Sequence, residues 1–176
     1  MTNIILCGCG GRMGKAIAAA LPSDVEIIAG VDINASALSA ALPFPVYENI
    51  ADFPGKADVI VDFSHHSALA SLLAYAKATK TPLVVATTGH TDEELALMRE
   101  AAKSVAIFHS GNFSIGINLI INLAKQAART LGADFDIEII EKHHNKKLDA
   151  PSGTALMIAN AVADEREESE YIYDRH

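Results

Sequence analysis

Residues 142–155, KHHNKKLDAPSGTA, gather groups that can carry charge and move protons. They contain the adjacent pair His143 and His144, and three lysines, Lys147 among them, fall within six residues. Histidine exchanges protons near neutral pH, and lysine brings a positive charge. The segment is therefore suited to a small anionic compound that takes up a proton during a reaction.

The same segment ends in a turn that opens a helix. Ser152 is the predicted N-cap of a helix with the sequence ALMIANAVA. The main-chain N–H groups of Gly153 and Thr154, with the Thr154 hydroxyl, then face outward at the positive end of that helix, which favours a carboxylate or a phosphate. The alternatives are a solvated basic loop and a zinc site. Adjacent histidines on an extended segment point apart and no third strong ligand is evident, so we predict no metal.

A glycine-rich turn near the N-terminus is the second feature that could do chemistry. Residues 8–14, GCGGRMG, follow an apolar run and open a helix. The third glycine comes later than in G-x-G-x-x-G, so Gly8, Gly11 and Gly14 form the regular set. Glycines let the backbone approach a pyrophosphate, and a helix N-terminus offers unpaired N–H groups. The turn predicts a dinucleotide site; the alternative is a tight strand-to-helix turn without a ligand.

Asp32 ends the second apolar run and is the candidate ribose ligand. A carboxylate there can accept hydrogen bonds from both hydroxyls of an adenine ribose and would repel a 2′-phosphate. The next residues, Ile33 and Asn34, supply no cation to offset that repulsion. The sequence therefore favours NADH over NADPH, although Arg12 and Lys15 could reach a phosphate.

Three further turns are expected at the same edge of a parallel sheet, at residues 64–66, 87–89 and 110–113. Small residues after a strand expose main-chain groups that can hold a flat amide such as nicotinamide. His65 and His66 could suggest a metal, but no carboxylate or cysteine spacing accompanies them. We interpret them as residues at the start of a helix.

The elements that must position these residues alternate along the chain. Apolar strands are predicted at residues 3–7, 25–31, 58–63, 82–87 and 104–108, with a short one near Val46, and helices at 11–21, 66–78 and 92–103. The last of these helices opens with the capping box T-D-E-E. The pattern predicts an α/β fold, a Rossmann-like doubly wound parallel sheet in a dinucleotide-binding domain over residues 1–112.

The pattern then changes, which predicts part of a smaller α+β substrate-binding and oligomerisation domain over residues 113–176. A long amphipathic helix is expected from Ile117 to Leu131, with Gly132 as its C-cap. Residues 136–141, DIEIIE, alternate in part, as a half-buried strand would.

Composition narrows the class of protein. The 176 residues carry a formal net charge of −8, which disfavours nonspecific nucleic-acid binding. No apolar run approaches the roughly 20 residues that a membrane helix needs, and the N-terminus does not resemble a signal peptide. Cys7 and Cys9, expected to point the same way on one strand, do not suggest a disulfide framework. We therefore predict a cytoplasmic protein with no membrane partner.

In combination these segments resemble the 4-hydroxy-tetrahydrodipicolinate reductase (dihydrodipicolinate reductase) family of lysine and diaminopimelate biosynthesis. The similar segments appear in family order, as GCGGRMG, VDFS, ATTGHT, GNFSIGIN and EIIEKHHNKKLDAPSGTA, and span residues 3 to about 163. The resemblance implies hydride transfer from NADH or NADPH to a cyclic unsaturated dicarboxylate, giving tetrahydrodipicolinate.

The resemblance also implies roles for individual residues. His143 is expected to donate the proton, with Lys147 assisting. The substrate carboxylate is expected to contact His144, Lys147, Gly153 and Thr154. The cofactor is expected to contact, besides Asp32, a pyrophosphate set of Gly8, Gly11, Arg12 and Met13, and a nicotinamide set of Thr87, Thr88, Gly89, Gly111 and Phe113.

Members of this family are expected to continue beyond residue 176 with strands of an open mixed sheet that builds a homotetramer. They are also expected to close about a hinge, which would lie near residues 110–116. Two alternatives keep the nucleotide-binding fold: a related NAD-dependent amino or imino acid dehydrogenase, and a nonenzymatic dinucleotide-binding module.

Overall fold

The chain divides into two compact units in the computed structural model, which describes residues 1–145 and 150–173. The first unit is Met1–Ser110 and the second is Gly111–His176. What each unit binds remains a prediction.

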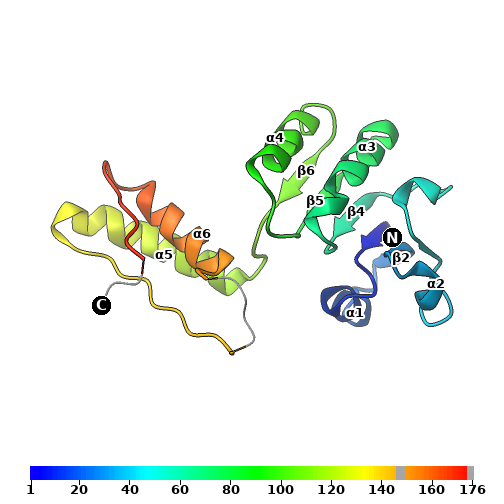
Figure 1. The fold of residues 1–176 in the computed structure, drawn as a ribbon, viewed down its shortest axis with the longest axis horizontal. Coiled ribbons are helices and arrows are strands. Elements are labelled where there is room, and N and C mark those ends of the chain that lie inside the picture. Colours follow the sequence, from blue (N-terminus) through cyan, green and yellow to red (C-terminus); the bar gives the residue numbers. More distant parts are fainter. Residues whose placement is uncertain (146–149, 174–176) are drawn as a thin grey trace. The chain divides into compact units, whose positions relative to one another are not determined.

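The first unit is built on one sheet of six parallel strands in the order β3-β2-β1-β4-β5-β6 (Figure 1). The strands are β1 Thr2–Cys7, β2 Val25–Val31, β3 Val46–Tyr47, β4 Val59–Asp62, β5 Leu83–Val85 and β6 Ile107–His109. Central strands such as β1 read as continuous apolar runs because both faces of the sheet are buried. The predicted doubly wound parallel sheet is confirmed.

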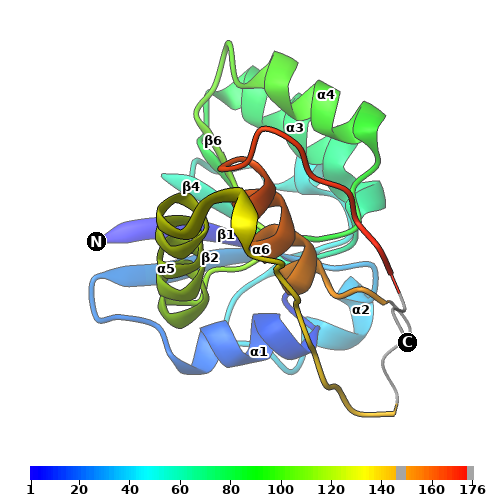
Figure 2. The same cartoon turned by 90° about the vertical axis from the view of Figure 1, so that its left-hand side faces the viewer.

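Helices cover both faces of this sheet, as Figure 2 shows. They are α1 Arg12–Ala19, α2 Ala35–Leu38, α3 Leu69–Thr79 and α4 Asp92–Ala101, with short 3₁₀ turns at Ile50–Asp52 and His66–Ala68. Ile4 and Leu6 face the side that α1 and α2 cover, whereas Ile5 faces the side of α3 and α4. The capping box predicted for α4 is confirmed, because Thr91 and Glu94 bond to each other's main-chain N–H groups.

The two cysteines correct one expectation. Both are buried and free, but Cys7 belongs to the core under α3 and α4, whereas Cys9 belongs to the core under α1 and α2. The prediction that they point the same way is wrong, because β1 ends at Cys7 and Gly8, with φ +75°, turns the chain before Cys9.

The second unit consists of helix α5, Ile115–Leu131, a 3₁₀ turn at Gly132–Asp134 and helix α6, Gly153–Ala163. Gly132 is the C-cap of α5, as predicted, whereas the helix begins two residues earlier than the predicted Ile117 and is capped there by Ser114. The two helices pack together, and Glu165, just after α6, forms ion pairs with Lys125 and Arg129 of α5.

The prediction of a strand at residues 136–141 is wrong. These residues are not assigned to any strand, and Ile137, Ile139 and Ile140 are exposed. A strand requires hydrogen bonds to a neighbouring strand, and the described residues of the second unit provide none.

None of the helices in the described part of the chain has both the length and the apolar character that a membrane crossing requires.

Candidate functional site

The turns after β1 and β4 meet in the middle of the sheet, where the strand order reverses. The Gly8 N–H donates to the Val31 carbonyl at 2.8 Å, and the Phe63 N–H donates to the Cys7 carbonyl at 3.0 Å. A Cβ added to Gly8 would lie 2.5 Å from the Phe63 carbonyl oxygen, so only glycine lets the two turns lie this close. Open α/β sheets bind ligands beside such a reversal.

The glycine turn, residues 8–14, presents main-chain N–H groups at the start of α1. Helix α1 has Gly11 at its N-cap and no side-chain cap, so its first amides keep their capacity to donate. Gly14 is buried, and a Cβ there would lie 2.4 Å from the Gly8 carbonyl oxygen. Arg12 and Met13 are exposed in the first turn. The structure therefore brings the four predicted pyrophosphate residues together at one helix end.

Asp32 lies beside this turn. Its carboxylate accepts from the Gly10 N–H at 2.9 Å and from the Asn34 N–H at 3.0 Å. Burial, with the nearby Asp32 charge, raises the pKa of the Cys9 thiol to about 11, so that this thiol stays neutral at physiological pH. The carboxylate is thus held next to the amides of the glycine turn by main-chain donors.

The threonine turn, residues 87–89, lies at the end of β5. Thr87 is buried and donates through its hydroxyl to Asp62 at 2.8 Å, and Asp62 also accepts from the main chain and the hydroxyl of Ser64. Gly89 has φ +81° and a Cβ there would point into open space. The turn is therefore anchored on one side and open on the other. The sequence analysis missed Asp62, although an acid that ends an apolar strand is a visible signal.

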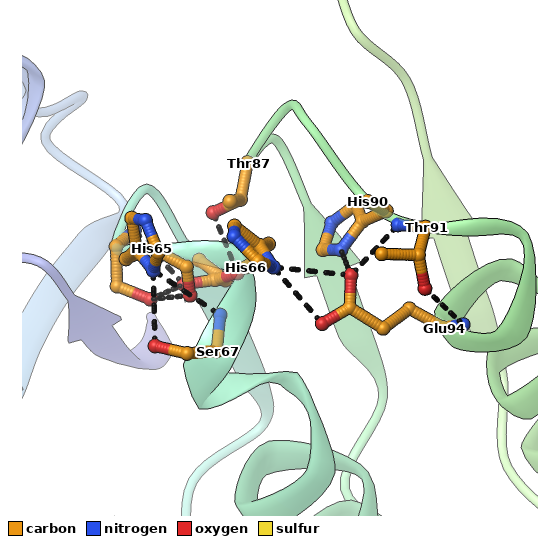
Figure 3. A network of polar contacts seen from close by, with 9 residues as sticks. His65, His66, Ser67, Thr87, His90, Thr91 and Glu94 are labelled. Carbon is orange, nitrogen blue, oxygen red and sulfur yellow. Dashed lines mark hydrogen bonds and ion pairs between the residues drawn. The ribbon is translucent and has the colours of Figure 1, made fainter.

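A group of histidines borders the threonine turn, as Figure 3 shows. His65 caps the 3₁₀ turn at Ser67, in agreement with its interpretation as a helix-start residue. His66 pairs with Glu94, and the ring of His90 lies between those of His66 and His109. Burial lowers the pKa of His109, and the nearby His90 adds to this effect. No group of three metal-holding side chains occurs among the described residues.

The second unit has candidate binding groups of its own at the start of α6. Ser152 accepts from the Ala155 N–H at 3.1 Å and caps the helix, as predicted. The Thr154 hydroxyl accepts from the side chain of Asn112 at 2.9 Å, while Asn112 also accepts from the Ser114 N–H at 2.8 Å. Asn112 therefore ties the beginnings of α5 and α6 together. It was not assigned a role from the sequence, although its neighbours Gly111 and Phe113 were.

Glu141 connects the histidine segment to α6. One carboxylate oxygen accepts from the Ser152 N–H at 2.8 Å, and the other lies 3.6 Å from His143 Nδ1. His144 is exposed next to it, and a Cβ added to Gly153 would meet nothing within 4 Å. Lys147 lies outside the described residues. The sequence analysis missed Glu141, although an acid two residues before a histidine is a visible signal.

The whole chain matches sequences and structures of known proteins. A family described as "Dihydrodipicolinate reductase, N-terminus" matches residues 2–113, and one described as "Dihydrodipicolinate reductase, C-terminus" matches residues 116–174. The 4-hydroxy-tetrahydrodipicolinate reductase of Clostridium tetani is 49% identical over 99% of this chain and 69% of the relative. The enzyme of the same name from Caldanaerobacter subterraneus is 48% identical over 100% of this chain and 69% of the relative.

The chain belongs to the dihydrodipicolinate reductase family. Members of this family are NAD(P)H-dependent reductases of lysine and diaminopimelate biosynthesis, as the sequence segments had indicated. The chain spans about 69% of the length of these two relatives.

Solved structures agree with the family assignment. A dipicolinate-bound dihydrodipicolinate reductase from Paenisporosarcina sp. TG-14 aligns with a TM-score of 0.78 and 28% identity, over 100% of this chain and 71% of that protein. A dehydrogenase from Chromobacterium violaceum aligns with a TM-score of 0.56 over 73% of this chain and 42% of that protein. At 16% identity, the second match shows the fold alone.

Proposed function

We propose that this chain reduces 4-hydroxy-tetrahydrodipicolinate to tetrahydrodipicolinate with a hydride from NADH. The observation that carries the proposal is the pair of helix starts with outward amides, one at the glycine turn and one at Gly153. A helix N-terminus favours an anion, and the reaction needs one such site for a diphosphate and one for a carboxylate.

The glycine turn fits the cofactor's pyrophosphate, and Asp32 fits its adenine ribose. The Asp32 carboxylate lies beside Gly10, and no cation follows it in the sequence to offset the charge of a 2′-phosphate. NADH is therefore the preferred cofactor. When bound, it supplies the hydride, while Thr87, Thr88 and Gly89 line the nicotinamide side and Gly111 and Phe113 complete it.

The start of α6 fits one carboxylate of the substrate. Gly153 is unobstructed and the Thr154 hydroxyl is oriented by Asn112. Lys147 adds a positive charge, and His144 adds a ring N–H that can donate a hydrogen bond. The dipicolinate bound to the structurally similar reductase is a ring with two carboxylates, the class of ligand that this arrangement would hold.

Protonation completes the reaction. The substrate loses its 4-hydroxyl group as water and gains one hydride and one proton, so a proton donor must lie beside the ring. His143 has the chemistry for this role, and Glu141, 3.6 Å from its Nδ1, can orient the ring. Lys147 assists. Reaction requires the donor carbon and the substrate carbon to approach to about 3–3.5 Å, which we expect to be achieved by closure about residues 110–116.

The family resemblance extends the proposal to the assembled protein. We propose a homotetramer built through the second unit and a cytoplasmic location, where the buried thiols of Cys7 and Cys9 stay reduced.

Calorimetric titration and assay of point variants test this function. We expect NADH to bind, pyridine-2,6-dicarboxylate to bind to the NADH complex, and His143→Ala to lower turnover by about 10²–10⁴-fold with NADH affinity unchanged. Lys147→Ala should also lower turnover. Asn145→Ala, a change in the same exposed segment, is the control and should stay near the native rate.

Three outcomes would contradict the proposal in distinguishable ways. Native turnover in both His143→Ala and Lys147→Ala rejects the assigned roles. Cofactor binding without dicarboxylate binding favours the nonenzymatic dinucleotide module. Turnover of amino or imino acids that pyridine-2,6-dicarboxylate does not inhibit favours the related dehydrogenase.

A further inference from the structure

One carboxylate, that of Glu94, joins two loops at the edge of the sheet (Figure 3). Its Oε1 lies 3.0 Å from His66 Nδ1, in the turn after β4. Its Oε2 accepts from the Thr91 N–H at 2.9 Å and lies 3.5 Å from His90 Nδ1, directly after the threonine turn. The side chain therefore contacts both the loop after β4 and the loop after β5.

A helix cap alone does not account for these contacts. The capping box uses only Oε2, whereas Oε1 is nearest to His66, a residue 28 positions away in the sequence. The hydrogen bond with His66 is the main cause of the lowered pKa of the Glu94 carboxyl, and the Thr91 N–H adds to it. The histidine contact is thus a separate interaction of an ionised carboxylate.

His90 gives a second, independent reason to look at this position. Its side chain is only 2% exposed, and neither ring nitrogen has a hydrogen-bond partner within residues 1–145 and 150–173. A buried polar ring without partners is costly, and the Glu94 carboxylate lies 3.5 Å from its Nδ1. His90 lies directly after the threonine turn. At the other end of the turn, the Thr87 hydroxyl donates a hydrogen bond to Asp62.

We propose that Glu94 is a positioning residue that holds the threonine turn in the shape that receives the nicotinamide, acting through His66 and His90. The threonine turn is then hydrogen-bonded to Asp62 at Thr87, and Glu94 lies 3.5 Å from His90 Nδ1 at its other end, while Gly89 faces open space between them. This inference rests on the proposed function, because it assigns the nicotinamide to this turn. Fixing the turn before binding reduces the ordering that the cofactor must impose.

Fluorescence titration of NADH against matched variants tests the role of Glu94. Glu94→Gln preserves a capping-box side chain but removes the charge, and should weaken NADH binding by about 3–10-fold, of the order expected for a charge-assisted hydrogen bond that acts indirectly. ADP-ribose, which lacks the nicotinamide ring, should bind equally to the native chain and to Glu94→Gln. His66→Asn should reproduce the loss, and the double variant should be no weaker than either single one.

Two controls separate positioning from helix stability and from net charge. Thr91→Ala removes the cap but leaves the carboxylate, so it should lower the melting temperature without changing NADH affinity. Glu100→Gln makes the same charge change on the same helix, where the partner is Lys103, and should also leave NADH affinity unchanged.

Several results would overturn the inference. They are NADH affinity within twofold of native in Glu94→Gln, an equal loss in Thr91→Ala, an equal loss for ADP-ribose, or additive effects in the double variant. Failure of the native chain to bind either NADH or ADP-ribose would reject the proposed function as well, which distinguishes the two failures.

Discussion

Among the single residues of this chain, three acidic side chains hold neighbouring main-chain groups in place. Asp32, Asp62 and Glu141 each accept hydrogen bonds from main-chain N–H groups and hold a second group in place. A carboxylate held by main-chain donors needs little reorganisation when a ligand arrives, because the donors are already oriented. This arrangement makes Asp32 a residue whose charge can be tested apart from its structural contacts.

We expect Asp32→Asn to reverse the cofactor preference. The asparagine oxygen can still accept from the Gly10 N–H, whereas its amide nitrogen cannot accept from the Asn34 N–H, so the contact to the glycine turn is kept while the repulsion of a 2′-phosphate is removed. NADH affinity should fall and NADPH affinity rise, changing their ratio by about tenfold, which corresponds to about 1.4 kcal/mol. Calorimetric titration with both cofactors measures the ratio.

Glu26→Gln is the matched control for this prediction, because it makes the same charge change at an exposed position of the preceding strand, β2. Glu26→Gln should leave the ratio of NADH affinity to NADPH affinity unchanged. An unaltered ratio in Asp32→Asn would show that this carboxylate does not discriminate between the two cofactors.

At the scale of elements, the start of α6 combines a helix cap with a proposed anion site. The Ser152 side chain closes the first turn, while the amides of the next residues and the Thr154 hydroxyl remain for a ligand. The cap and the charge at this position can therefore be changed separately.

Two substitutions of Ser152 should separate helix stability from anion binding. Ser152→Ala removes the cap and should lower the free energy of unfolding by about 1 kcal/mol, with dicarboxylate affinity falling only slightly. Ser152→Asp supplies a capping oxygen but adds a negative charge at a buried position beside Glu141, so it should not raise stability above the native value and should weaken pyridine-2,6-dicarboxylate binding by at least about tenfold. Urea unfolding and calorimetry measure the two effects. Equal dicarboxylate affinity in both variants would place the anion elsewhere.

At the scale of the whole molecule, the second unit leaves much apolar surface exposed. Ile115, Leu119 and Leu123 are spaced along α5 and are 86%, 57% and 55% exposed. Ile140 and Ile172 are also exposed, at 82% and 70%. Apolar patches of this kind mark surfaces that other protein segments cover.

We expect this chain to self-associate through that surface. Sedimentation velocity should show larger assemblies as the concentration of the chain is raised from about 1 to 100 μM. The driving force is the burial of apolar surface, which contributes roughly 25 cal/mol per Å². Leu119→Lys with Leu123→Lys should shift the chain toward monomer. Leu97→Lys, at a position on α4 that is 53% exposed, is the matched control and should not. A native chain that remains monomeric at the highest concentration would contradict the expectation.

Features that depend on neighbouring residues could be predicted before the fold was known. Apolar runs of strand length that alternate with helices indicated the doubly wound sheet, because the periodicity of each segment reports how it is buried. The ends of helices were also predictable, because a cap is formed by residues within a few positions of the helix end. Thr91 with Glu94, Ser152 and Gly132 are examples. The segments that indicated the reductase family are likewise contiguous in the chain.

Contacts between residues far apart in the chain could be identified only in the folded structure. The pairing of His66 with Glu94 and of Asn112 with Thr154 joins residues 28 and 42 positions apart, and no local pattern indicates it. The same reason explains the wrong prediction at residues 136–141, whose alternation is typical of a strand although the described residues of the second unit contain no strand to pair with it. Local propensity limits the conformations that a segment can adopt, but hydrogen bonds and packing with distant residues select among them.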